Sequence, residues 1–188
     1  MIRLVFLHGL EGSPQGRKPS WLRAAGFEVT APTLPTQTLM PYLGQALSRL
    51  PEHSFAEALA VAQAAVEATR PEVLIGSSFG GGLAVELCHR GLWRGPLVLL
   101  APAARRAFGH DRLPALGARA AVLHGRFDDI VPPQDSLELA ARSRGDVELT
   151  LVDDDHRLAA SVDRGLMGRL IHHVLEKNQF DGRAFERS

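Results

Sequence analysis

The sequence predicts an α/β protein built on an open, mostly parallel sheet of about six strands with helices on both faces. Short apolar runs alternate with longer, alanine-rich and charged segments along most of the 188 residues, which is typical of strands joined by crossover helices. The apolar runs are nearly continuous, which indicates strands buried on both faces. The length suits one domain with a sizeable core. We place that domain at residues 1–177 and interpret residues 178–188 as a polar C-terminal tail.

The boundaries of the elements follow from composition and from residues that interrupt regular structure. The predicted strands are residues 2–7, 27–31, 72–75, 96–101, 120–125 and 147–152. The predicted helices are residues 18–25, 54–69, 83–87, 133–142 and 164–176. Gly26 ends the first helix and Pro71 ends the second. Three prolines, at positions 32, 35 and 41, exclude regular structure from most of the loop after the second strand.

Charge and cysteine content exclude several classes of function. The formal net charge is zero, from 21 basic and 21 acidic residues, and neither sign forms a large block. Binding to nucleic acid or to an anionic membrane surface therefore has no support. No apolar run approaches the roughly 20 residues that span a bilayer, and the first apolar run is too short for a signal peptide. The single cysteine, Cys88, cannot form an internal disulfide, so we expect a buried packing role and a cytoplasmic location. The oligomeric state stays open.

One short motif combines a strand, a sharp turn and a helix around a serine. The segment Gly76-Ser77-Ser78-Phe79-Gly80 follows the apolar run at 72–75 and precedes a helical segment. This context is that of a G-x-S-x-G nucleophile elbow, with Ser78 at its centre. The alternative is that Ser78 is a helix N-cap, where serine is also common.

A nucleophilic serine needs a base, usually an imidazole, which in turn needs a carboxylate to fix its tautomer. On an open α/β sheet the expected chain order is serine, acid, histidine. Asp128 follows the strand at 120–125, and His156 follows the strand at 147–152. Asp129 is an alternative acid, Asp128 is alternatively a turn residue, and His156 is alternatively a surface histidine. His124 precedes the acid, which favours a structural hydrogen-bonding role.

Four motifs in order resemble those of the α/β-hydrolase superfamily, and most closely those of small lidless bacterial esterases of the YqiA type. These are His8-Gly9-Leu10-Glu11-Gly12-Ser13-Pro14, Gly76-Ser77-Ser78-Phe79-Gly80, the G-x-x-D-x-x-V-P pattern from Gly125 to Pro132, and Asp155-His156. The resemblance covers nearly the whole chain. It implies an α/β-hydrolase fold without a large lid.

The resemblance also implies a role for each matching position. Ser78 would be the nucleophile, Asp128 the acid and His156 the base. The backbone N–H groups of Leu10 and Phe79 would form the oxyanion hole, where fixed donors stabilise developing charge. His8 would be a scaffold residue of the oxyanion loop.

The reaction implied is hydrolysis of carboxylic esters with short to medium acyl chains, through an acyl-enzyme. Four alternatives use the same triad: an acyl-CoA thioesterase, an acyl-protein thioesterase, a peptidase and an acyltransferase. A non-catalytic binding protein on this scaffold would usually lack one triad member, whereas all three candidates are present. The expected partner is a small-molecule ester or thioester.

The pocket is expected to be open and shallow. Larger relatives insert a lid between the fourth and fifth strands assigned above, and here residues 102–119 are too few for a separate cap domain. The remaining walls are expected from the loop 33–42 and from residues 103–108. The candidate pocket residues are Leu34, Leu39, Met40, Tyr42 and Phe108.

The sequence gives no sign of a cofactor or metal site. The glycines at 80–82 are followed by Leu83, whereas a phosphate-binding P-loop needs a lysine there. Close packing of helix on strand explains these glycines better. The acidic cluster before His156 has no second histidine or cysteine at ligand spacing.

Overall fold

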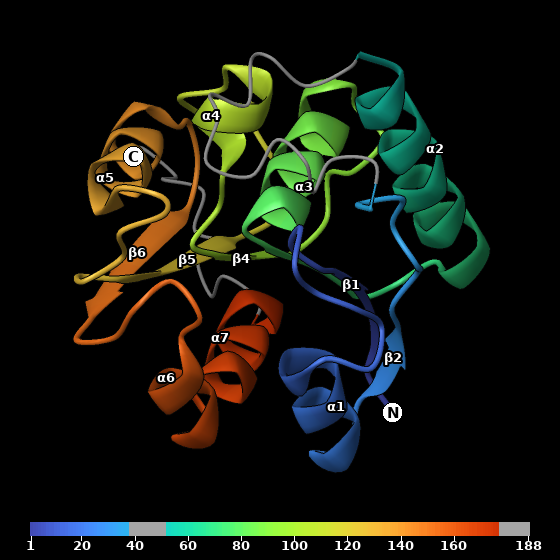
Figure 1. Cartoon of the computed structure of the whole chain (residues 1–188), viewed down its shortest axis with the longest axis horizontal. Helices are drawn as coiled ribbons and strands as arrows, with labels where there is room; N and C mark the ends of the chain where they lie inside the picture. The colour runs from blue at the N-terminus through green and yellow to red at the C-terminus, as the bar shows by residue number, and fades with distance from the viewer. Residues whose placement is uncertain (38–51, 177–188) are drawn as a thin grey trace, which may run out of the picture.

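The computed structural model describes residues 1–37 and 52–176, and in it six strands form one sheet (Figure 1). The strand order is β2-β1-β3-β4-β5-β6, and each of the five neighbouring pairs is parallel. The strands are β1 (Arg3–Leu7), β2 (Glu28–Thr30), β3 (Val73–Ser77), β4 (Leu97–Leu100), β5 (Ala120–Gly125) and β6 (Val147–Val152). The predicted fold class is therefore confirmed.

Seven helices in the described residues cover both faces of the sheet. They are α1 (Arg17–Ala24), α2 (Glu52–Thr69), α3 (Phe79–His89), α4 (Ala104–Phe108), α5 (Pro133–Arg142), α6 (Ala159–Asp163) and α7 (Leu166–Leu175). Helices α2, α3, α4 and α5 lie on one face, and α1, α6 and α7 lie on the other (Figure 1).

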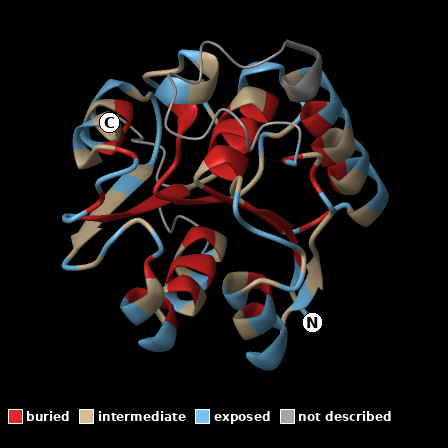
Figure 2. Ribbon diagram, in the orientation of Figure 1, coloured by how far each residue is buried: buried red, intermediate tan, exposed pale blue. Residues whose placement is uncertain are grey.

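Each face of the sheet has its own apolar core. Val5 and Leu7 of β1 pack with the helices α2 and α3, whereas Leu4 and Phe6 pack with α1 and α7. This alternation follows from the pleat, which points successive side chains to opposite faces. All four of these side chains are fully or almost fully buried, and Figure 2 shows the buried band running through the sheet. The inner strands β1, β3, β4 and β5 thus bury both of their faces, as predicted. The edge strands β2 and β6 contain no buried residue, because each has a neighbouring strand on one side only.

The connections contain two elements that the sequence did not predict. The segment between β4 and β5 holds the short helix α4, and no large lid exists in the part of the chain that the structure describes. The expected last helix at 164–176 is preceded by a separate short helix, α6, because Gly165 adopts a φ of 73° and interrupts the helical path. The predicted tail at 178–188 lies outside the described residues.

The parallel arrangement brings the carboxyl ends of all strands to one edge. Residues that follow β1, β3, β5 and β6 include His8, Ser78, Asp128 and His156, respectively. Ligands of open α/β sheets bind beyond this edge. Among the described helices, none has the length and apolarity needed to cross a membrane.

Candidate active site

Ser78 lies at the sharp turn between β3 and α3 in a strained backbone conformation. Its φ is 54° and its ψ is −117°, a region that L-residues other than glycine rarely adopt and that costs about 1–3 kcal/mol. The surrounding backbone holds the turn, because the Ser78 N–H donates to the Leu100 carbonyl at 2.9 Å and its carbonyl accepts from the Ala103 N–H at 2.9 Å. The hydroxyl makes no helix-capping hydrogen bond. Ser78 thus occupies the N-cap position of α3, but its hydroxyl does not cap the helix and is available to other groups.

The glycines at both ends of the motif permit close contact of helix and strand. A Cβ atom on Gly80 would lie 2.1 Å from the Leu7 carbonyl oxygen, and one on Gly76 would lie 2.4 Å from the Gly80 carbonyl oxygen. Both contacts are with backbone atoms, which cannot move aside like a flexible side chain. The G-x-S-x-G spacing thus reflects a steric requirement of the turn.

Gly80→Ala is expected to destabilise the protein by about 3 kcal/mol or more, because overpacking of rigid backbone shifts the elements around it. For a chain of this length the Tm should fall by roughly 6–12 °C. Gly117→Ala is the matched control, since its Cβ would meet its nearest neighbour at 3.9 Å. Thermal unfolding followed by circular dichroism measures both, and equal Tm values for the two variants would contradict the steric explanation.

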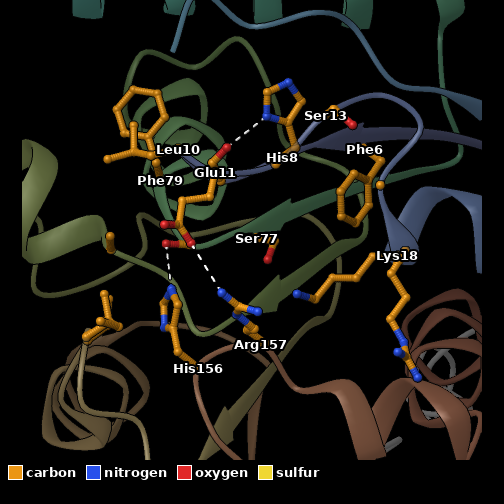
Figure 3. A pocket seen from close by; sticks show the side chains of 18 of the residues that line it. Phe6, His8, Leu10, Glu11, Ser13, Lys18, Ser77, Phe79, His156 and Arg157 are labelled. Atoms are coloured by element: carbon orange, nitrogen blue, oxygen red, sulfur yellow. Dashed lines mark hydrogen bonds and ion pairs between the residues drawn. The ribbon is translucent and has the colours of Figure 1, made fainter. Parts of the chain in front are cut away.

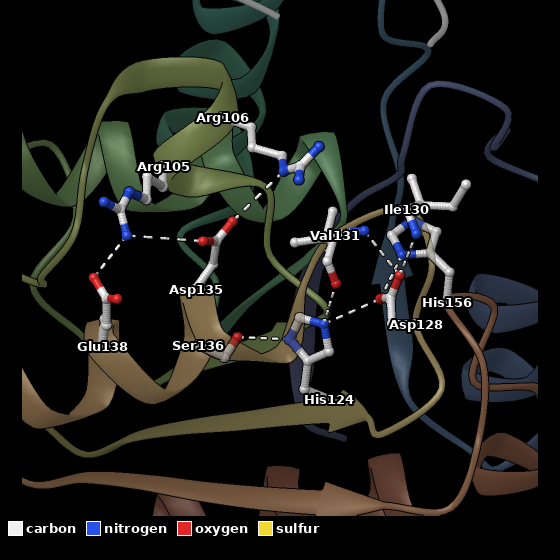
Figure 4. A network of polar contacts seen from close by, with 10 residues as sticks. All are labelled: Arg105, Arg106, His124, Asp128, Ile130, Val131, Asp135, Ser136, Glu138 and His156. Atoms are coloured by element: carbon white, nitrogen blue, oxygen red, sulfur yellow. Dashed lines mark hydrogen bonds and ion pairs between the residues drawn. The ribbon is translucent and has the colours of Figure 1, made fainter. Parts of the chain in front are cut away.

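The Asp128 carboxylate is fully buried and receives hydrogen bonds at both oxygens (Figure 4). Oδ1 accepts from the backbone N–H groups of Ile130 at 2.9 Å and Val131 at 2.8 Å. Oδ2 lies 2.7 Å from His156 Nδ1 and 3.0 Å from His124 Nε2. Burial alone raises the pKa of Asp128, but hydrogen bonds from His124, His156 and the Val131 N–H outweigh it and hold the pKa well below its usual range. The group is an anion at neutral pH.

The position of His156 defines its tautomer. Nδ1 faces the Asp128 carboxylate, which can only accept, so Nδ1 carries a proton. Nε2 lies 2.9 Å from Ser78 Oγ, and in the neutral ring it accepts the hydroxyl proton. The structure thus brings Ser78, His156 and Asp128 into one hydrogen-bonded chain. Asp129, the alternative acid, is exposed at the rim of the pocket.

His124 contacts the same carboxylate oxygen of Asp128, Oδ2, as His156 does. Its ring is fully buried, with Nδ1 2.6 Å from Ser136 Oγ and Nε2 2.9 Å from the Val131 carbonyl oxygen. Because the Val131 carbonyl and the Asp128 carboxylate both accept, Nε2 carries the proton and shares it between them. The structure therefore places His124 in a hydrogen-bonding role, as the sequence indicates.

His8 organises the loop after β1 through hydrogen bonds of both ring nitrogens. Its Nε2 accepts from the Leu34 N–H at 3.2 Å, and its Nδ1 donates to the Gly9 carbonyl at 2.8 Å. Burial lowers the pKa of His8, which the hydrogen bond to Gly9 only partly opposes, so the ring is neutral. This contact places Gly9 against the serine, where a Cβ on Gly9 would lie 3.1 Å from Ser78 Cβ. Leu10 and Phe79 both line the pocket (Figure 3).

Ser78 and His156 open onto a cavity of about 1470 Å³ at the carboxyl edge of the sheet. Two of the expected pocket residues lie elsewhere. Leu34 is buried in the core, whereas Phe108 is partly buried and stacks on Phe79 with ring centroids 6.2 Å apart. Neither residue is on the lining of this cavity. The other three expected wall residues, Leu39, Met40 and Tyr42, lie outside the described residues.

The sequence reasoning missed the charged residues of this cavity. The cationic side chains on its lining are Arg17, Lys18, Arg105, Arg106 and Arg157, and the anionic ones are Glu11, Asp129 and Asp135. Lys18 and Arg157 could have been noticed, because each closely follows a loop at the carboxyl end of a strand. No cluster of three or more histidine, cysteine, aspartate or glutamate side chains suited to a metal ion occurs in residues 1–37 and 52–176.

Comparisons with known proteins agree with this architecture. The chain matches the model of the Alpha/beta hydrolase family over residues 4–181. A solved structure from Xanthomonas campestris, described as a hydrolase of the alpha/beta superfamily, is 26% identical, with a TM-score of 0.69 over 93% of this chain and 98% of that one.

Two other solved structures share the fold at lower identity. Est1E from Butyrivibrio proteoclasticus, solved with ferulic acid, is 15% identical, with a TM-score of 0.66 over 94% of this chain and 90% of that one. A monoacylglycerol lipase from Paleococcus ferrophilus is 15% identical, with a TM-score of 0.63 over 91% and 94%. No curated protein matches the sequence.

The family match spans nearly the whole domain, from the first strand to beyond the last described helix. The protein therefore belongs to the alpha/beta hydrolase family and is a hydrolase of that superfamily.

Proposed function

We propose that the protein is a serine esterase that cleaves carboxylic esters of short to medium acyl chains. The observation that carries this proposal is the position of the His156 ring. Its Nε2 lies 2.9 Å from Ser78 Oγ and its Nδ1 lies 2.7 Å from Asp128 Oδ2. A base within hydrogen-bond reach of a serine, oriented by a carboxylate, is the arrangement that activates a nucleophile.

The reaction proceeds in two acyl-transfer steps. His156 Nε2 takes the proton as Ser78 Oγ attacks the acyl carbonyl carbon, and the tetrahedral intermediate carries its charge on the former carbonyl oxygen. Collapse breaks the bond to the alcohol or thiol, which leaves with the proton from His156. Water then repeats the sequence on the acyl-enzyme and releases the acid. Asp128 keeps the imidazolium oriented and stabilises its charge.

The oxyanion is stabilised by the backbone N–H groups of Leu10 and Phe79. Phe79 is the first residue of α3, so its N–H has no carbonyl partner within the helix. The N–H of Leu10 has no hydrogen-bond partner among the residues that the structure describes. Two free donors beside Ser78 support this assignment, and one such donor is typically worth about 3–4 kcal/mol of barrier.

The open cavity supports small, dissolved substrates. The connection between β4 and β5 contains only the short helix α4, so no large lid from this segment has to move before a substrate reaches Ser78. We expect hydrolysis without activation at an oil–water interface. The ferulic acid bound by one structural neighbour and the lipase activity named for another are consistent with ester chemistry on this scaffold.

A substrate panel tests the reaction class. We expect the purified protein to hydrolyse p-nitrophenyl esters with two- to eight-carbon acyl chains, with a burst of p-nitrophenol that reports the acyl-enzyme. Acyl-CoAs and aminoacyl p-nitroanilides in the same panel separate thioesterase and peptidase activity from esterase activity. Folded protein that cleaves only the amides, or none of the probes, would contradict the proposal.

A further inference from the structure

Lys18 places a positive charge inside the cavity that holds Ser78. It is the second residue of α1, its side chain is half-buried, and it lines the same cavity as Ser78 and His156. Figure 3 shows its amine extending into the cavity between Ser77 and Arg157. No carboxylate among the described residues lies within 4.0 Å of this amine.

The carboxylates nearest to Lys18 already have other partners. Asp154 Oδ2 accepts from the Ser161 N–H at 2.8 Å and from the Ser161 hydroxyl at 2.7 Å. Asp155 Oδ1 accepts from the Arg157 N–H at 2.8 Å. Burial lowers the pKa of Lys18 to about 8, although Asp155 and Asp154 oppose this shift. The ammonium is thus partly desolvated without a direct counter-ion, which is unfavourable in the free protein.

The other cations of the cavity lining differ from Lys18 because each has a carboxylate partner. Arg17 pairs with Asp163. Arg105 lies 2.6 Å from Glu138, and Arg106 lies 3.6 Å from Asp135. Arg157 contacts Glu11 only at 3.8 Å, and its side chain is 79% exposed. Lys18 is therefore the cation of this lining that has no carboxylate contact in the described part of the chain, and Arg157, at the rim, is the most exposed of the others.

Building on the proposed esterase function, we propose that the natural substrate carries an anionic group, a carboxylate or a phosphate, which binds the Lys18 ammonium while its ester carbonyl lies at Ser78. Arg157 adds a second positive charge beside this anion. The anion supplies the counter-ion that Lys18 lacks, so binding energy is gained at a position remote from the reacting bond. Lys18 is a specificity-determining residue and takes no part in the chemistry at Ser78.

Two matched probe pairs test this and distinguish the two sources of the anion. The first pair is p-nitrophenyl hemiadipate and neutral p-nitrophenyl heptanoate, which places a carboxylate on the acyl chain. The second pair is butyryl-CoA and neutral butyryl-N-acetylcysteamine, which places phosphates on the leaving group. For each pair, kcat/KM of the charged probe is divided by that of the neutral probe, in the wild type and in Lys18→Met.

We expect Lys18→Met to lower this ratio by about 10- to 100-fold in one of the two pairs, the size of a lost charge-assisted hydrogen bond. Lys18→Arg should restore the ratio to within about threefold. Arg144→Met removes an exposed charge outside the cavity and should leave it unchanged. A change below about threefold in both pairs overturns the proposal. If the wild type hydrolyses the neutral probes but not the charged ones, the anion-binding proposal is also wrong, although the proposed esterase function is unaffected. If activity persists in Ser78→Ala, the esterase mechanism is contradicted instead.

The ratio should also depend on pH and salt. The charged groups that face Lys18 are Asp154, Asp155 and Arg157 from the loop after β6 and Arg17 from its own helix. Lys18 is protonated below about pH 8, so the preference for the charged probe should be present below that pH and disappear above it. Higher ionic strength should weaken it. A preference that is independent of pH between 7 and 9.5 would show that another group binds the anion.

Discussion

Ser78→Ala should lower kcat for p-nitrophenyl ester hydrolysis by about 10⁵- to 10⁶-fold, close to the effect of removing the whole triad. The variant lacks the only hydroxyl that lies 2.9 Å from His156 Nε2 among the described residues, and a water in its place is not held for attack. The oxyanion donors remain, so a residual rate of about 10³-fold over water is expected. The effect should fall on kcat rather than on substrate binding.

Steady-state kinetics and thermal unfolding together measure this result. Ser20→Ala is a matched control, because Ser20 is an exposed serine of α1 whose hydroxyl donates to the Gln15 carbonyl. It should retain full activity. If Ser78→Ala is folded and keeps more than about one hundredth of the wild-type kcat, another residue is the nucleophile and the proposed mechanism is wrong.

Asp128→Asn should lower kcat/KM by about 10⁴-fold, because it favours the tautomer of His156 that cannot accept the Ser78 proton. Asp128 Oδ1 accepts two backbone N–H groups, from Ile130 and Val131. An asparagine keeps these bonds only if its carbonyl oxygen takes that side, which turns its NH₂ group toward His156 and His124. His156 Nδ1 must then accept, its proton moves to Nε2, and the ring can no longer take the proton of Ser78.

The measurement is the pH profile of kcat/KM with the unfolding free energy of each variant. Asp129→Asn is the control, since Asp129 is exposed and makes none of these contacts; its kcat/KM should stay within about threefold.

Asp128 has a lower pKa in the folded protein than in the unfolded chain. It therefore stabilises the fold above about pH 4 and loses this contribution as the pH falls. The Asp128→Asn variant should lack this pH-dependent contribution to the free energy of unfolding. A wild-type activity in the same variant would contradict the role of Asp128 as the acid of the triad.

The order of the elements and the residues that meet at the sheet edge follow from local patterns. Continuous apolar runs predict strands buried on both faces, and the structure shows β1 with alternate side chains in two cores. Because all strands are parallel, residues after β3, β5 and β6 must lie at one edge. This is why the sequence alone predicts that Ser78, Asp128 and His156, which are far apart along the chain, are neighbours in the fold.

Contacts that depend on side-chain direction could not be predicted in this way. The apolar content of their segments predicts Leu34 and Phe108 in the pocket wall, but Leu34 is buried in the core and Phe108 stacks on Phe79. The sequence predicts a helix at 18–25 but not which of its side chains enter the cavity, and the position of Lys18 on the cavity lining follows from the packing of α1 beside the loop after β6. The break before α7 depends on the positive φ of Gly165, which the sequence permits without requiring.

The most direct test of the central claim is reaction with a p-nitrophenyl alkylphosphonate followed by peptide mass spectrometry. This reagent phosphonylates an activated serine and releases p-nitrophenol, while His156 takes the hydroxyl proton. We expect one adduct per chain, located on Ser78, with loss of esterase activity in step with labelling and much slower labelling in His156→Gln. An adduct on a different residue, or unlabelled Ser78 in protein whose esterase activity is abolished, would contradict the assignment of Ser78 as the nucleophile.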